Sequence, residues 1–114
     1  MRPSFQSRLI SGILKLISLK TIVEKQAKKP IKRSKKAFLP QKIEQSYLSK
    51  SQTCNGKAFA TFESKEKVSQ DHIIFLHGGA YIFEASTGHW DLAKKIVDKS
   101  FCRMTLVDYP LAPE

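Results

Sequence analysis

The chain has 114 residues and a formal net charge of +10, from 20 Lys and Arg against 10 Asp and Glu. That length suffices for one small domain, but it is about half of what a large single α/β domain needs. Cys54 and Cys102 lack the spacing of a disulfide scaffold or a zinc site, which predicts two ordinary thiols in a reducing cytoplasm.

The positive charge is concentrated in the N-terminal half. Residues 1–57 carry 14 Lys and Arg against only Glu24 and Glu44, a net charge of +12. Residues 58–114 carry 6 Lys and Arg against 8 acidic residues, a net charge of −2. Such an asymmetry indicates a contact with nucleic acid or a membrane, or simply a basic arm.

Apolar residues recur at helical spacing near the N-terminus and predict one amphipathic helix from about Ser4 to Glu24. Two interpretations stay open: the apolar stripe packs on the rest of the protein, or a cationic helix lies on an anionic membrane. The stretch 9–19 is interrupted by Lys15 and is shorter than the roughly 20 residues that span a bilayer. No small-residue cleavage site follows, so we expect neither a signal peptide nor a transmembrane helix.

Residues 25–36 contain seven cations and Pro30, which predicts a solvated linker because like charges repel and proline interrupts regular structure. A nucleic-acid-binding arm would interleave aromatic residues or belong to a recognisable fold, so no nucleic acid partner is expected. Residues 1–40 are therefore predicted to form a basic amphipathic helix and linker. Weak contact with an anionic membrane through residues 4–36 is the remaining candidate interaction.

From residue 41 the apolar period changes to two. Ile43, Gln45 and Tyr47 alternate, and a second run covers residues 58–63. Between them lies Asn55-Gly56, a strong type I′ turn signal because both residues tolerate positive φ. The pattern predicts an antiparallel hairpin.

Residues 72–76 form a continuous apolar run, typical of a strand buried on both faces in a parallel sheet. A helix capped by Ser86 or Thr87 is expected next, followed by a buried strand at 104–107. The expected buried stripe of the helix is Trp90, Ala93, Ile96 and Val97. Strand, helix and strand make a βαβ unit with a right-handed crossover.

The segment His77-Gly78-Gly79-Ala80-Tyr81 lies between the first of these strands and the helix. Two glycines allow a sharp turn that leaves backbone N–H groups unpaired and directed into a cleft. Preorganised donors of this kind stabilise the oxyanion of a tetrahedral intermediate. The alternatives are a phosphate loop, disfavoured because neither G-x-G-x-x-G nor G-x-x-x-x-G-K-[ST] is present, and a purely structural turn.

A second landmark, Asp108-Tyr109-Pro110-Leu111-Ala112-Pro113-Glu114, begins 31 residues after His77. Together HGGAY and DYPLAPE resemble the HGGG-type oxyanion loop and the D-Y-R-L-A-P-E segment of the hormone-sensitive-lipase-like esterases, a family of α/β-hydrolases. The resemblance covers about 43 residues. It implies an α/β fold over 41–114, the N-terminal part of an α/β-hydrolase sheet in which the hairpin precedes the βαβ unit. By position alone, residues 1–40 would correspond to the helical cap of these enzymes, so the helix and linker are cap-like.

The resemblance also implies roles for single residues. Gly79 and Ala80 would supply oxyanion-hole N–H groups, Gly78 would shape the turn, and His77 would brace the loop through local backbone rather than act as the base. Two positions depart from the family pattern. Ala80 replaces a third glycine, which is tolerable if φ there is negative. Pro110 replaces an arginine, so a guanidinium that could brace neighbouring loops is lost.

The sequence contains no G-x-S-x-G, and none of the Ser, Asp/Glu and His residues of a triad can be assigned. The chain is therefore expected to be an N-terminal fragment of a carboxylic-ester hydrolase for short or medium acyl esters, inactive alone. Neither a metal nor another cofactor is expected. The alternatives are a basic module that binds an anionic membrane or nucleic acid, and a non-functional remnant.

Overall fold

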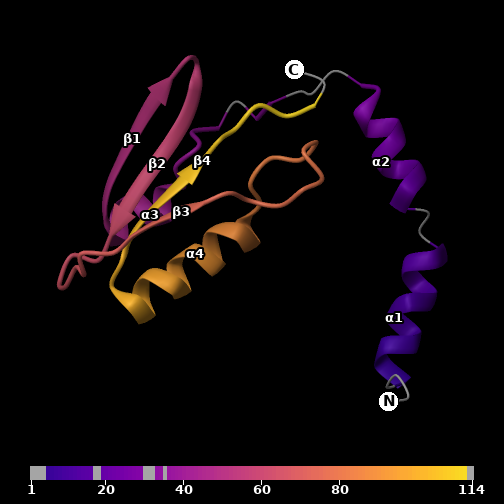
Figure 1. The fold of residues 1–114 in the computed structure, drawn as a ribbon, viewed down its shortest axis with the longest axis horizontal. Helices are drawn as coiled ribbons and strands as arrows, with labels where there is room; N and C mark the ends of the chain where they lie inside the picture. The colour runs from indigo at the N-terminus through magenta and orange to yellow at the C-terminus, as the bar shows by residue number, and fades with distance from the viewer. Residues whose placement is uncertain (1–4, 17–18, 30–32, 35, 113–114) are drawn as a thin grey trace.

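The computed structural model describes residues 5–16, 19–29, 33–34 and 36–112. Two helices, α1 (Phe5–Leu16) and α2 (Leu19–Ala27), form an arm that stands apart from the rest of the chain (Figure 1). A short helix α3 (Gln41–Ser46) precedes the strands β1 (Leu48–Cys54) and β2 (Lys57–Glu63). The βαβ unit follows as β3 (His72–Phe75), α4 (Thr87–Ser100) and β4 (Arg103–Val107).

The predicted hairpin is confirmed for β1 and β2, which pair antiparallel from Leu48 opposite Glu63 to Cys54 opposite Lys57. Asn55 and Gly56 between them have φ values of 50° and 73°, as a type I′ turn requires. The predicted beginning of the hairpin was wrong, because residues 41–46 are helical.

Helix α3 explains the pattern that suggested a strand. Ile43 and Tyr47 are both buried, whereas Gln45 between them is exposed. Apolar residues four positions apart lie on one face of a helix as well as on one face of a strand. Pro40 stands at the N-cap of α3, where its missing N–H costs no hydrogen bond, and the Tyr47 N–H closes the helix on the Ile43 carbonyl.

The four strands form one mixed sheet in the order β1-β2-β4-β3. β4 lies between an antiparallel neighbour, β2, and a parallel neighbour, β3. The fold is the predicted one: an α/β arrangement in which an antiparallel hairpin precedes a βαβ unit, as in the N-terminal part of an α/β-hydrolase sheet.

Helix α4 lies along one face of this sheet (Figure 1). Ser86 is its N-cap, and a capping box links Ser86 with His89. The predicted stripe is confirmed, since Trp90, Ala93 and Val97 are buried and Ile96 packs against them. Together with the sheet and the segment before β1, the helix encloses the core, which comprises Leu39, Ile43, Tyr47, Ala60, Phe62, Trp90, Ala93, Val97, Cys102, Met104 and Leu106.

The expectation that residues 72–76 are buried on both faces was wrong. β3 is an edge strand, and Ile74 and Leu76 are each 67% exposed. Ile73 and Phe75 alternate with Ile74 and point to the opposite face, where Phe75 packs against the core cluster that includes α4. Within the described part of the chain, that is the face covered by helix α4, so Ile74 remains on the surface.

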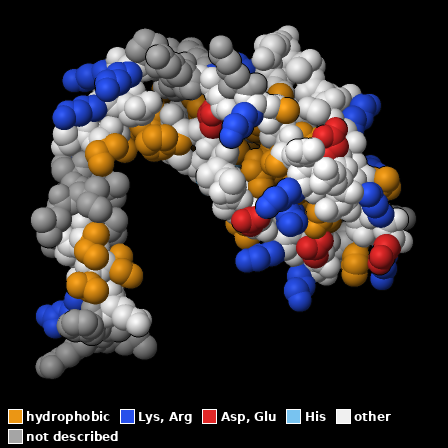
Figure 2. Space-filling model, turned by 180° about the vertical axis from the view of Figure 1, so that it is seen from behind, with side chains coloured by type: hydrophobic (Ala, Val, Ile, Leu, Met, Phe, Trp, Pro, Cys, Tyr) orange, Lys and Arg blue, Asp and Glu red, His pale blue; other side chains and the backbone are white. Residues whose placement is uncertain are grey.

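In the N-terminal arm, two helices occur where one was expected. Residues 17–18 between them, the predicted start at Ser4 and Pro30 of the linker lie outside the described residues. Apolar side chains of the arm are exposed, at 56% for Leu9, 57% for Ile10 and 48% for Ile13. Figure 2 shows hydrophobic side chains along the side of the arm that faces the rest of the chain, with open space between the two. Within the described ranges, no helix is long and apolar enough to cross a membrane.

Candidate active site

The two sequence motifs meet at the carboxyl ends of β3 and β4. Because these strands are adjacent and parallel, the loops that follow them leave the same edge of the sheet. The Tyr109 hydroxyl donates a hydrogen bond to the His77 carbonyl oxygen at 2.5 Å, and the two rings stack with centroids 4.5 Å apart. The Ala112 N–H donates to the Tyr81 carbonyl oxygen at 2.7 Å. The DYPLA segment thus forms one wall of the HGGAY loop.

His77 is buried, with 4% of its surface exposed. Its Nδ1 lies 2.8 Å from the Gly78 carbonyl oxygen. A carbonyl can only accept, so Nδ1 carries a proton and donates to it. Among the described residues, Nε2 is buried without a hydrogen-bond partner. The structure therefore places the imidazole against the loop's own backbone.

The loop turns through three consecutive residues with positive φ: 131° at Gly79, 52° at Ala80 and 61° at Tyr81. The Gly79 carbonyl accepts hydrogen bonds from the N–H groups of Ile82 and Phe83, at 3.0 and 3.1 Å, which close the turn. The condition set for Ala80, a negative φ, is not met. Ala80 occupies the left-handed region at a cost of roughly 1–2 kcal/mol, held there by the tight closure of the turn.

The N–H groups of Gly79 and Ala80 donate no hydrogen bond to any of the described residues. Both residues line an open cavity of about 570 Å³, together with Leu76, His77, Gly78, Tyr81, Tyr109 and Pro110. Polar backbone donors beside an open cavity can bind an acceptor oxygen of a ligand.

Tyr109 lines this cavity and contacts His77. Burial, and to a smaller extent the nearby Tyr81 hydroxyl, raises the pKa of Tyr109 above its usual value. The phenol therefore stays protonated at neutral pH and keeps donating to the His77 carbonyl. The sequence motif includes Tyr109, but nothing in its one-dimensional pattern indicated this contact with His77.

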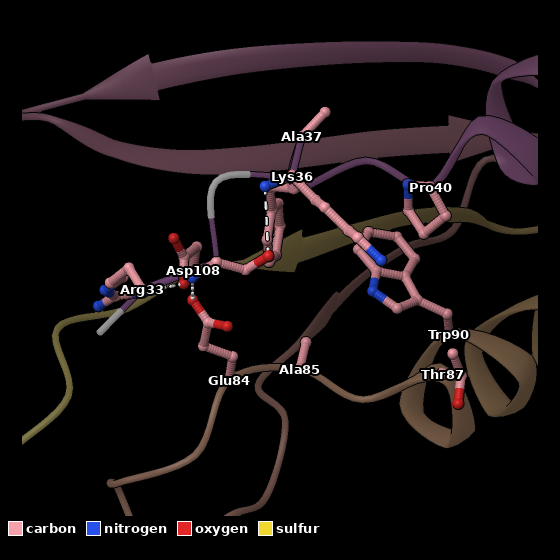
Figure 3. Close-up of a pocket in the computed structure, with 11 residues that line it drawn as sticks. Arg33, Lys36, Ala37, Pro40, Glu84, Ala85, Thr87, Trp90 and Asp108 are labelled. Carbon is pink, nitrogen blue, oxygen red and sulfur yellow. Dashed lines mark hydrogen bonds and ion pairs between the residues drawn. The ribbon is translucent and has the colours of Figure 1, made fainter. Parts of the chain in front are cut away.

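The sequence also gave no sign that Arg33 and Glu84 border the site. Arg33, in the segment predicted to be a solvated linker, forms an ion pair with Asp108, 75 residues away. The Ser34 N–H donates to Glu84 Oε1 at 2.9 Å. A second cavity, of about 320 Å³, lies between residues 33–40 and the loop that leads into α4 (Figure 3).

The structure places no metal-binding cluster in the described ranges: no three His, Cys, Asp or Glu side chains come together there. His72 lies in β3, with its Nε2 2.8 Å from the Thr105 hydroxyl, and His89 serves the cap of α4. Cys54 is exposed and Cys102 is buried, both as free thiols.

A family described as the alpha/beta hydrolase fold matches residues 73–114. Over these residues the chain is similar to that family. The matched residues run from β3 through the HGGAY loop and α4 to the end of the DYPLAPE segment, so they contain the candidate site. No curated protein sequence is significantly similar to the chain.

Solved esterases share the fold. A Pyrobaculum calidifontis esterase is 19% identical over 98% of this chain and 36% of its own, with a TM-score of 0.56. A candidate esterase from Staphylococcus aureus is 19% identical over 99% of this chain and 33% of its own, with a TM-score of 0.56. An esterase of the bacterial hormone-sensitive lipase family is 19% identical over 82% of this chain and 34% of its own, with a TM-score of 0.50. The present chain spans about a third of the length of each.

Proposed function

We propose that this chain carries the oxyanion-binding part of a carboxylic-ester hydrolase that acts on short or medium acyl esters. The observation that supports it most is the pair of unpartnered N–H groups, at Gly79 and Ala80, beside the cavity of about 570 Å³. Esterase activity in the solved proteins of the same fold agrees with this reaction class.

In the proposed reaction the ester carbonyl oxygen lies against these two N–H groups. A serine hydroxyl attacks the carbonyl carbon as its O–H bond breaks and its proton passes to a general base; neither the serine nor the base is assigned among these 114 residues. The C=O π electrons move onto oxygen, and the two donors stabilise the resulting oxyanion. Each such donor contributes about 2.7–4 kcal/mol to the transition state. His77 keeps the loop in place, because its Nδ1–H donates to the Gly78 carbonyl and its own carbonyl accepts from the Tyr109 hydroxyl. We assign His77 no proton transfer.

The 114 residues hold no G-x-S-x-G nucleophile, so the chain alone should not turn over esters. Purified chain mixed with p-nitrophenyl acetate should release p-nitrophenol no faster than buffer. A saturable rate that survives His77→Ala would show that ester chemistry resides elsewhere in the chain, and would overturn this assignment.

A loop graft tests the oxyanion donors directly. Residues 76–83 and 108–112 would replace their structural equivalents in the Pyrobaculum calidifontis esterase, which keeps its own nucleophile. We expect kcat within about tenfold of the host. A folded graft whose kcat falls by about 10²–10³-fold, the loss that follows removal of one donor, would contradict the proposal. The matched control exchanges an equally long surface loop, residues 64–71.

We propose a second candidate function for the arm, weak contact with an anionic membrane. It is favoured by the exposed apolar residues Leu9, Ile10 and Ile13 together with exposed cations, among them Lys20 and Lys25. An interfacial helix combines these two features.

Vesicle co-sedimentation tests this contact. Full chain should bind vesicles that contain phosphatidylserine, bind phosphatidylcholine vesicles less, and lose binding on Ile10→Glu. Ile74→Glu is the matched control, because Ile74 is at least as exposed but lies outside the arm. Equal effects of both variants, or binding to RNA in place of vesicles with a steep salt dependence, would refute the membrane assignment.

A further inference from the structure

Arg33 is tied to the segment that follows β4 by two contacts. Its Nη1 forms an ion pair with the Asp108 carboxylate, and its Nη2 donates to the Tyr109 carbonyl oxygen at 3.0 Å. The side chains of Arg33 and Asp108 are only 22% and 17% exposed. Contacts between charged groups that are largely removed from water are stronger and better ordered than surface ion pairs.

The next residue binds the other side of the site. The Ser34 N–H donates to Glu84 Oε1 at 2.9 Å, and Glu84 directly follows the turn that ends at Phe83. Arg33 therefore contacts the segment that follows β4, and Ser34 contacts the segment that follows the turn of the HGGAY loop. Figure 3 shows Arg33 directed at Asp108, with Glu84 beside it.

The contacts of Arg33 continue into the oxyanion loop through Tyr109. Arg33 holds the carbonyl of Tyr109, whose hydroxyl donates to the His77 carbonyl and whose ring stacks on the imidazole. His77 in turn donates to the Gly78 carbonyl. A continuous series of hydrogen bonds and one stacked pair thus leads from Arg33 to the glycines.

We propose that Arg33 is a positioning residue for the oxyanion loop, and that it supplies from the N-terminal segment the guanidinium that is missing at Pro110. The resembled motif has an arginine at that place, whereas Pro110 has no donor and is exposed. This inference rests on the proposed function for its catalytic meaning, but its structural content stands separately. It makes Arg33 and Ser34 part of the site rather than of a linker.

Amide hydrogen exchange of the full chain tests the inference without any ester substrate. Arg33→Ala should accelerate exchange of the Ile82, Phe83 and Ala112 amides by about tenfold or more, the effect of losing hydrogen bonds to a charged group. Amides of the β4 residues Thr105 and Leu106 should be unchanged. Arg33→Lys keeps the charge but cannot hold both acceptors in the same geometry, so it should restore part of the protection.

The matched control is Arg103→Ala, which removes an ion pair with Glu63 that lies on the sheet away from the loop. It should leave the loop amides at their original rates. The ¹⁵N signals of the His77 ring give a second readout: Arg33→Ala should shift them away from the Nδ1-protonated tautomer, and Arg103→Ala should not.

The inference is overturned if Arg33→Ala and Arg103→Ala affect the loop amides equally, or if Arg33→Lys gives no more protection than Arg33→Ala. If Arg33→Ala unfolds the chain, Arg33→Lys decides through the same amides. Partial protection of the loop supports the inference, whereas full protection overturns it, because the bidentate contact would then not be needed. An inactive loop graft together with accelerated exchange of the loop amides in Arg33→Ala would refute the proposed function and leave the positioning role intact.

Discussion

The adjacent glycines of the HGGAY loop should respond very differently to the same substitution. A Cβ on Gly79 would lie 2.9 Å from the Phe83 carbonyl oxygen and 3.0 Å from the Phe83 Cβ, and φ there is 131°. A Cβ on Gly78 would meet only His89 Nε2, at an ordinary 3.7 Å, with no positive φ. Gly79→Ala is therefore both strained and crowded, whereas Gly78→Ala is neither.

The magnitude follows from the backbone. Holding alanine in a region that only glycine populates costs about 1–3 kcal/mol, and the contact with a backbone carbonyl adds to it. If the loop opens locally, this cost corresponds to exchange about 5- to 150-fold faster at the Ile82 and Phe83 amides, which donate to the Gly79 carbonyl. Gly78→Ala should change the free energy of opening by no more than about 0.5 kcal/mol.

Amide hydrogen exchange followed by mass spectrometry, with urea denaturation to monitor global stability, distinguishes these outcomes. Equal acceleration by Gly78→Ala and Gly79→Ala would refute the reasoning, because it would mean that loop order depends on glycine content and not on the positive φ at Gly79. Unchanged exchange in both variants would refute it as well, since the turn would then tolerate a side chain.

Three further outcomes are expected. Burial, the hydrogen bond to Asp98 and that residue's charge raise the pKa of Tyr47 to about 12. Unfolded tyrosine ionises near 10, so the contribution of Tyr47 to stability should be complete below pH 10 and be lost as pH rises from 10 to 12. In urea titrations Tyr47→Phe should remove this part of the pH dependence and leave the part due to Tyr109, whose pKa is also raised. Phe62→Ala empties a fully buried position and should lower the free energy of unfolding by about 3–5 kcal/mol, whereas Leu92→Ala on the exposed side of α4 should cost under about 1 kcal/mol; similar losses would contradict the core assignment. Ile74→Lys, on the open face of an edge strand, should reduce light scattering of concentrated protein without changing its unfolding midpoint, and unchanged scattering would show that β3 does not mediate self-association.

Local signals predicted much of the fold. The Asn55-Gly56 turn, the Ser86 cap and the stripe of α4 depend on short-range chemistry, and all three occur as expected. The helix at 41–46 was missed because Ile43 and Tyr47 satisfy both a helical and an extended period. The burial of β3 was overestimated because an apolar run does not reveal how many faces of its sheet are covered.

Some features of the candidate site could also be predicted from the sequence, and others could not. That the HGGAY and DYPLAPE segments lie together could be expected from adjacent parallel strands. The left-handed conformation of Ala80 could not, because it results from two hydrogen bonds to the Gly79 carbonyl that close the turn. The docking of Arg33 was also beyond reach: in a run of seven cations, sequence alone does not show which one meets a carboxylate 75 residues away.

The position of β4 has a consequence for how the chain acquires its structure. Among the described strands β4 comes last in sequence, but it lies inside the sheet, where it joins β2 to β3. Until residues 103–107 have been synthesised, the ribosome presents a lone hairpin, which is marginally stable in water, and an unpaired apolar strand at 72–75. Sheet formation must therefore wait for long-range pairing with β4. This step is slow, and until it occurs β3 can bind chaperones or other nascent chains.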